Sequence, residues 1–252
     1  ANTSGGYNTA VGRETLIANT TGDGNTAVGG LALDANTTAD GNTAMGWAAL
    51  SANTTGSQNV AVGYQALEAN TIAGDNTAIG YGALQDNTTG SSNTACGHRA
   101  LARNTTGTFN VAVGRIALDN VTTGSQNIAV GYNAGGSITT GNENVCIGQD
   151  TGDRITTGDR NVLIGDDADV DVSGRDRACA LGQGVSTFAT DSTTRILGDN
   201  GVYNTGNTSN WSTTSDRRLK KNIVDCTIGL DTIKQIVVRN FEYRTASEIT
   251  DA

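Results

Sequence analysis

The chain has 252 residues, among them 34 Gly, 3 Phe and no Pro, and it carries a formal net charge of −9. The hydrophobic share of 36% is low, so we expect a thin core that is spread along the chain. The acidic balance argues against a nucleic-acid-binding surface, which would need a basic patch. No apolar run reaches the roughly 18 residues of a membrane-spanning helix, so we expect no insertion into a membrane.

A five-residue motif recurs every 17 residues through residues 1–185. It first reads NTAVG at 8–12 and last, without its Asn, ACALG at 178–182. Leu16 and six equivalent leucines follow the motif in register. Seventeen residues are too few for a pair of helices but suit one coil of a β-solenoid, whose strands stack about 4.8 Å apart. We therefore predict an all-β protein, a parallel β-solenoid (β-roll) of about eleven coils over residues 1–185.

The invariant positions of the repeat fit such a stack. The absence of Pro leaves every backbone N–H free to pair with the next coil. The Gly that closes each strand, from Gly12 to Gly182, fits a corner with positive φ or with no room for a side chain. The leading Asn, present in ten consecutive copies, predicts a ladder of side-chain amides along the stack.

Two adjacent strand positions are apolar in every copy. The third residue of the motif is Ala in nine copies, and the fourth is a larger apolar residue such as Val28 or Ile79. Because consecutive strand residues point to opposite faces, both faces of the strand must be kept from water. We expect the alanine face to pack against other copies of the chain, since small residues allow close approach. The pattern thus predicts a homo-oligomer.

The cysteine, histidine and acidic side chains, which could bind a metal or react, give no sign of a metal or cofactor site. Cys96, Cys146 and Cys179 stand at strand positions, so we expect small buried apolar side chains without disulfides. His98 is the only histidine, which excludes a histidine cluster. The acidic stretch 166–176 is typical of either a solvated turn or a cation site, and we favour the solvated turn. We predict no metal and no cofactor.

One variable column follows the glycine of each strand and is the candidate for receptor contacts. The alternative is that this column is an ordinary exposed rim of the solenoid with no binding role. Its aromatic and cationic members in the middle of the repeats are Trp47, Tyr64, Tyr81, His98, Arg115 and Tyr132.

After an expected irregular neck at 186–214, residues 215–223 read SDRRLKKNI. This string resembles the start of the C-terminal intramolecular chaperone domain of bacteriophage tail fibres and tailspikes of the endosialidase type. The resemblance implies that 215–252 is the N-terminal part of a small α+β chaperone domain, which trimerises the fibre and then cleaves itself off. It further implies Ser215 as nucleophile, Lys220 as general base, Asp216 and Arg218 as supporting residues, and cleavage between Thr214 and Ser215.

A serine paired with a neutral lysine is an established variant of nucleophilic catalysis. We therefore expect at most a single-turnover Ser-Lys endopeptidase that acts on its own chain, with no external substrate. The repeats also resemble the head repeats of trimeric autotransporter adhesins, in which three rolls pack side by side.

The resemblance implies a structural virion protein, a homotrimeric tail-fibre segment that is assembled in the host cytoplasm and attaches to the host. Its expected partners are two further copies, other tail proteins, and a host surface glycan or protein. The alternatives are a bacterial trimeric surface adhesin and, ranked lower, a polysaccharide-degrading tailspike, which would need two carboxylates about 5–10 Å apart in a groove.

Overall fold

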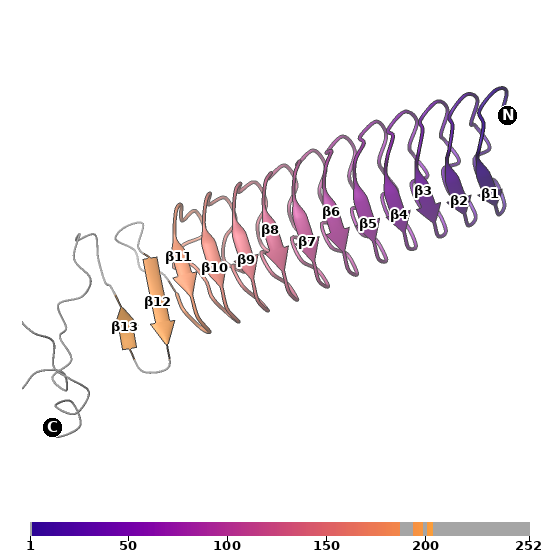
Figure 1. The fold of residues 1–252 in the computed structure, drawn as a ribbon. Helices are drawn as coiled ribbons and strands as arrows, with labels where there is room; N and C mark the ends of the chain where they lie inside the picture. The colour runs from indigo at the N-terminus through magenta and orange to yellow at the C-terminus, as the bar shows by residue number, and fades with distance from the viewer. Residues whose placement is uncertain (1, 187–193, 199–200, 204–252) are drawn as a thin grey trace, which may run out of the picture. The chain divides into compact units, whose positions relative to one another are not determined.

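The fold is described from a computed structural model, which defines residues 2–186, 194–198 and 201–203. One sheet runs through these residues, with its strands in chain order (Figure 1). Each of the first eleven strands has three residues. The strands are β1 (Thr9–Val11), β2 (Thr26–Val28), β3 (Thr43–Met45), β4 (Val60–Val62), β5 (Thr77–Ile79), β6 (Thr94–Cys96), β7 (Val111–Val113), β8 (Ile128–Val130), β9 (Val145–Ile147), β10 (Val162–Ile164), β11 (Cys179–Leu181), β12 (Thr194–Gly198) and β13 (Gly201–Tyr203).

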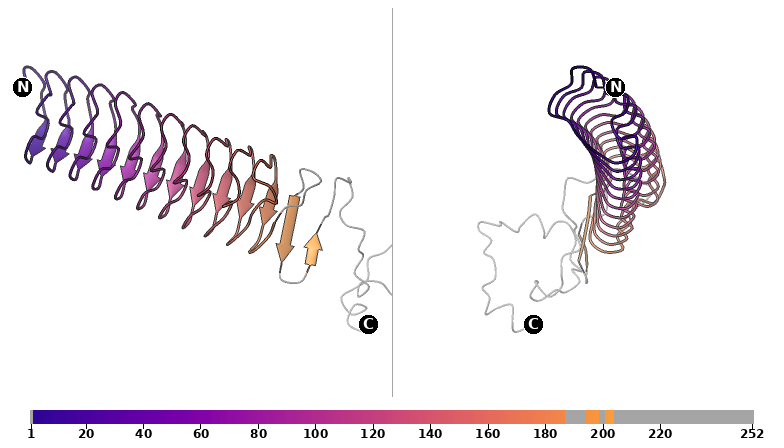
Figure 2. Two further views of the ribbon diagram at one scale, coloured as in Figure 1. Left: turned by 180° about the vertical axis from the view of Figure 1, so that it is seen from behind. Right: turned by 90° about the vertical axis from the view of Figure 1, so that its right-hand side faces the viewer.

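The predicted β-solenoid is confirmed. Neighbouring strands from β1 to β11 pair in parallel with a shift of 17 residues, so that Ala61 lies beside Ala78 and Ala44. The turns between strands also bond to the next coil, as when the N–H of Leu67 donates to the carbonyl of Ala83 at 3.0 Å. Successive coils therefore follow the same path, as the end-on view in Figure 2 shows.

The predicted direction of the alanine column is wrong. From β2 onward the strand alanines, such as Ala61 and Ala78, are completely buried inside their own coil, where they form one core with the leucine column represented by Leu67. The larger fourth residue faces outward instead, and Met45 and Ile79 are 45% and 42% exposed. A coil this thin has room for a methyl group opposite each leucine and for nothing larger.

The glycine that closes each strand is required for two reasons, as predicted. Its φ lies between 127° and 143° in all eleven copies, a region that side chains disfavour. A Cβ on Gly63 would also collide with the carbonyl oxygen of Gly80 in the next coil. Stacking at this corner is thus backbone against backbone.

The leucine column adopts an unusual backbone conformation. Leu16 and the six equivalent leucines have φ between 51° and 55°, the left-handed region that costs a residue other than glycine about 1–2 kcal/mol. Two late coils replace this leucine by Gly135 and Gly152. There Ile138 and Ile155, which stand where earlier coils have Asn, are fully buried and supply the missing apolar volume.

The neck departs in part from its predicted irregular structure. Within 186–214, strand β12 pairs in parallel with β11, and β13 pairs antiparallel with β12. The sheet therefore continues beyond the last repeat. In the part of the chain that the structure describes, no helix is long and apolar enough to cross a bilayer.

Candidate functional surfaces

An uncharged apolar strip runs along the outside of the sheet. We call it the outward strip, and it comprises the second and fourth motif residue of each strand from β1 to β11. The second residues are Thr, Val, Ile or Cys, and the fourth are Val, Ile, Met, Cys or Leu. None of these positions is charged, although 16% of the chain is. At about 4.8 Å per strand the strip is roughly 50 Å long. Single exposed apolar residues are ordinary, but a continuous strip of this length marks an interaction surface.

A second column lies beside the outward strip, immediately after the strand glycine. Trp47, Tyr64, Tyr81 and His98 stack ring on ring, with centroids 4.9, 5.2 and 5.2 Å apart and planes within 20° of parallel. Two coils continue the column with a cation–π pair, in which the guanidinium of Arg115 lies 5.6 Å from the ring of Tyr132. We call these six residues the aromatic column. The structure thus brings all the predicted receptor candidates into one line, which leaves their role untested.

The predicted asparagine ladder is present, and it bonds to the backbone. Asn76 donates from Nδ2 to the carbonyl of Gly90 at 3.0 Å, and its Oδ1 accepts the N–H of Asn93 at 2.9 Å. A second ladder was not predicted from the sequence. It begins at Asn2, and each later asparagine through Asn104 donates from Nδ2 to Oδ1 of the asparagine 17 residues before it.

The second ladder ends where the sequence changes. Val121 follows Asn104 in that column, and the Oδ1 of Asn104 is buried without a hydrogen-bond partner. The signal for this ladder was the asparagine in register with the leucine, three residues after it. Its role is structural, because the asparagines from Asn19 to Asn104 are at most 1% exposed.

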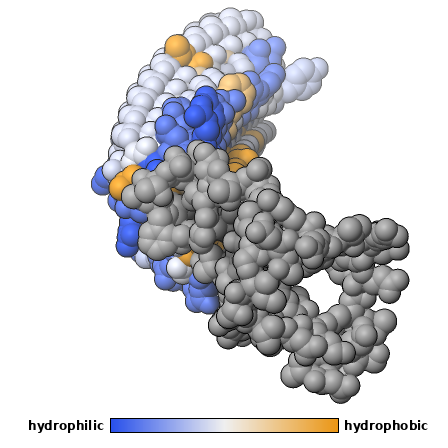
Figure 3. Space-filling model, turned by 90° about the vertical axis from the view of Figure 1, so that its left-hand side faces the viewer, coloured by the Kyte–Doolittle hydropathy of each residue, from blue (hydrophilic) through white to orange (hydrophobic). Residues whose placement is uncertain are grey.

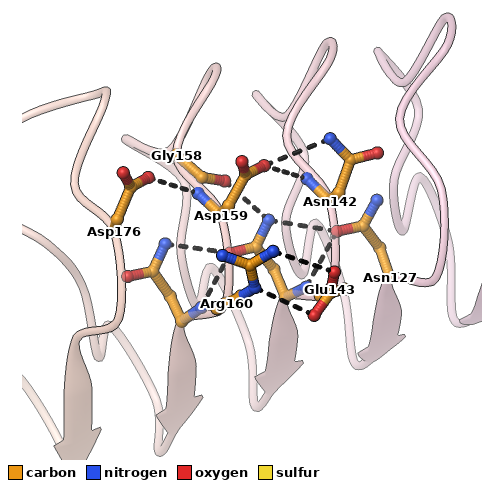
Figure 4. Close-up of polar contacts among 9 residues, drawn as sticks. Asn127, Asn142, Glu143, Gly158, Asp159, Arg160 and Asp176 are labelled. Carbon is orange, nitrogen blue, oxygen red and sulfur yellow. Dashed lines mark hydrogen bonds and ion pairs between the residues drawn. The ribbon is translucent and has the colours of Figure 1, made fainter.

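A third polar column occupies the turn before most strands, and Figure 4 shows it in the late coils. Asp159 accepts the backbone N–H of Asn142 at 2.7 Å, and its own N–H donates to Asp176 at 2.8 Å. Beside it, Arg160 pairs with Glu143 at 3.1 Å. The acidic segment thus includes Asp176 as a structural acceptor. Figure 3 shows that strongly hydrophilic residues occupy bands of the surface separate from the paler ones.

The three described cysteines are free, as predicted, but only one of them is buried. Cys146 replaces a core alanine, and burial raises the pKa of its thiol to about 12. Cys96 is exposed and Cys179 is half-buried, because both belong to the outward strip. The expectation of burial was therefore wrong for these two.

A cavity of about 360 Å³ at the last coil is lined by Asp153, Arg154, Asp167, Asp169, Gly184 and Ser186. Asp169 is 6% exposed, and burial together with a hydrogen bond between the Asp169 and Asp153 carboxyls raises the pKa of Asp169 to about 7. The backbone N–H of Val170 donates to the same carboxyl at 2.7 Å. Two carboxyls in hydrogen-bond contact lack the 5–10 Å separation of a glycoside-hydrolysing pair. Among the described residues, no group of three or more suitable side chains is placed to hold a metal ion.

The predicted cleavage residues, Ser215, Asp216, Arg218 and Lys220, lie outside the described residues. A family comparison addresses this segment. Residues 215–252 match the model of the Peptidase S74 family, described as chaperone of endosialidase. The chain thus joins a β-solenoid to a segment similar to that chaperone. No curated protein and no solved structure matches the chain.

Proposed function

We propose that the chain is a segment of a homotrimeric tail fibre of a bacteriophage, which serves attachment to the host and is assembled by a C-terminal intramolecular chaperone. The family match at 215–252 carries this proposal, because it supports a chaperone directly behind a repetitive rod. The virion is the location that follows from it, with assembly in the host cytoplasm.

The outward strip supports assembly from several copies. An apolar face about 50 Å long must be covered, and a second copy offers the same 17-residue repeat, the same strand spacing and the same lack of charge. Three copies with their strips turned toward a common axis would cover all three faces. The number three comes from the chaperone resemblance.

Charge substitutions within the strip test this assembly. Val113→Glu and Ile147→Glu place carboxylates on positions that are each 37% exposed in the single chain. We expect both variants to sediment as smaller species than the wild type, because a buried unpaired charge opposes association. Thr123→Glu is the matched control on an exposed turn away from the strip. Unchanged sedimentation of both strip variants would refute the assignment of the interface.

The cleavage proposal concerns the bond between Thr214 and Ser215. In this scheme the neutral amine of Lys220 takes the proton of the Ser215 hydroxyl, the serine oxygen attacks the carbonyl carbon of Thr214, and the amine of Ser215 leaves with a proton. Because that nitrogen belongs to the same residue, an ester within the chain forms first, and water then hydrolyses it. Each step balances without a cofactor.

Expression of the complete gene tests this step. The wild type is expected to lose a C-terminal fragment on a denaturing gel, whereas Ser215→Ala and Lys220→Ala remain intact. Equal processing of Ser215→Ala and the wild type would refute the role of this serine. Glu14→Gln is a suitable control, because its side chain is surface-exposed and remote in sequence.

A further inference from the structure

The aromatic column is not explained by the fold. The same position is Arg13, Gly30, Gln149 or Asp166 in other coils of the same geometry, so the solenoid accepts almost any side chain there. Six consecutive coils nevertheless carry rings or a guanidinium. The large aromatic side chains of this column also remain exposed, with Trp47, Tyr64 and Tyr132 at 44%, 43% and 43% and Tyr81 at 50%.

The stacked rings are rigid, and their polar tips are unused. Each inner ring is held between the rings of the neighbouring coils, so little side-chain entropy is left to lose on binding. Within the described residues the Tyr64 and Tyr81 hydroxyls make no hydrogen bond, and neither does the indole N–H of Trp47. Aromatic surface with a few convergent polar groups is typical of a binding site.

The spacing restricts what such a column can bind. Its rings repeat every 4.9–5.2 Å along the solenoid and offer one polar tip per coil. A ligand that uses several tips at once must itself repeat at this distance. An extended sugar chain does so, since each ring advances by about the spacing of stacked strands. A coiled chain of the same sugars does not.

The charge of the protein restricts the class of ligand further. The four stacked residues from Trp47 to His98 include no permanently charged side chain, and the net charge of −9 opposes approach of a polyanion. The N-terminal end of the stack is open as well, because Gly30 has no side chain to cover Trp47. A neutral sugar ring can pack against this end.

We propose that the aromatic column binds an extended, uncharged glycan that lies along the solenoid with one sugar beside each coil. This inference rests on the attachment role proposed above and specifies its ligand class. Weak contacts at successive coils add up, as they do for linked binding units, so affinity grows with chain length.

Calorimetric titration of the full-length protein with cello-oligosaccharides and chito-oligosaccharides of increasing length tests the proposal. We expect no measurable binding of single sugars, a rise in affinity with each added sugar, and a plateau at about six sugars, one for each coil from Trp47 to Tyr132. Maltohexaose, whose chain is coiled, is expected not to bind. Equal affinity for maltohexaose, or affinity that is independent of length, would overturn the proposal.

Variants locate the site on the column. Tyr64→Ala and Tyr81→Ala should each weaken binding of the longest ligand about tenfold. Phe109→Ala removes a ring that is 61% exposed in a different column and should leave binding unchanged. Circular dichroism confirms that each variant is folded. Unaltered binding by both tyrosine variants would refute the column as the site, whereas failed cleavage or failed assembly with normal glycan binding would refute only the function proposed above.

Discussion

Replacement of Asn76 by Ala tests whether the first asparagine ladder holds the coils together. The side chain is completely buried and makes two hydrogen bonds to the backbone. The N–H of Asn93 has Oδ1 of Asn76 as its partner and would be left unpaired. The carbonyl of Gly90 also accepts Nδ2 of Asn87 at 2.9 Å, so it would lose one partner and keep the other.

The expected loss follows from this difference between the two groups. A buried donor left without a partner costs about 1–3 kcal/mol, and loss of one of two hydrogen bonds costs about 0.5–1.5 kcal/mol. We therefore expect Asn76→Ala to lower the free energy of unfolding by about 1.5–4.5 kcal/mol. Because each coil contacts only its neighbours, the damage should be greatest around β5 and β6.

Guanidinium unfolding followed by circular dichroism measures this loss, at one fixed protein concentration because association contributes to stability. Thr89→Ala is the control, since that exposed threonine makes no side-chain hydrogen bond and should change stability by less than about 0.5 kcal/mol. Hydrogen exchange localises the effect to the coils beside residue 76. A loss below about 1 kcal/mol for Asn76→Ala would refute the reasoning, because the N–H of Asn93 would then have another partner.

Three further predictions follow from the core, the glycine corner and the last coil. Leu67→Ala should lower the free energy of unfolding by about 2–5 kcal/mol through a cavity, whereas exposed Ile72→Ala should have little effect in the same denaturation experiment. Gly63→Ala should prevent correct stacking and reduce the yield of folded protein, while Gly24→Ala, which has open space around its Cβ, should cost about 1 kcal/mol. The folded-state pKa of Asp169 is raised from its ordinary value of 3.8 to about 7, so its contribution favours folding most at acidic pH and declines as pH rises toward 7. The slope of Tm against pH over this interval should flatten in Asp169→Asn, and an unchanged slope would contradict the assignment.

The repeat was readable because every coil solves the same packing problem. The period of 17, the parallel register and the glycine corner all follow from residues that recur without exception, such as Gly63. The direction of the strand faces was not readable, because Ala61 and Val62 are both apolar. The structure resolves this through volume: the leucine from the opposite wall, such as Leu67, leaves space for a methyl group only.

The other features that the sequence did not reveal depend on positions where different residue types fill the same structural role in different coils. The acceptor in the turn before most strands is Asp, Ser or Asn, so the column of Asp159 looks irregular although the same hydrogen bond recurs in several coils. The left-handed φ of Leu67 could not be predicted, because such a position is usually signalled by Gly. Leu is kept there because the free energy gained by burying its side chain outweighs the backbone strain. The exchange of Leu for Gly135 together with Asn for Ile138 looks like decay of the repeat, yet it preserves the core.

The columns of equivalent residues can be separated into those that the fold requires and those that it does not. The glycine corner and the first asparagine ladder admit almost no variation, because neighbouring coils contact each other there directly. The position after the glycine varies from Gly30 to Trp47 between adjacent coils, so folding does not select its side chain. Stacking of exposed rings contributes only about 0.5–1.5 kcal/mol per pair, and the coils without rings fold with the same register. A run of rings at a position that tolerates glycine is therefore better explained by what the rod contacts than by how it folds.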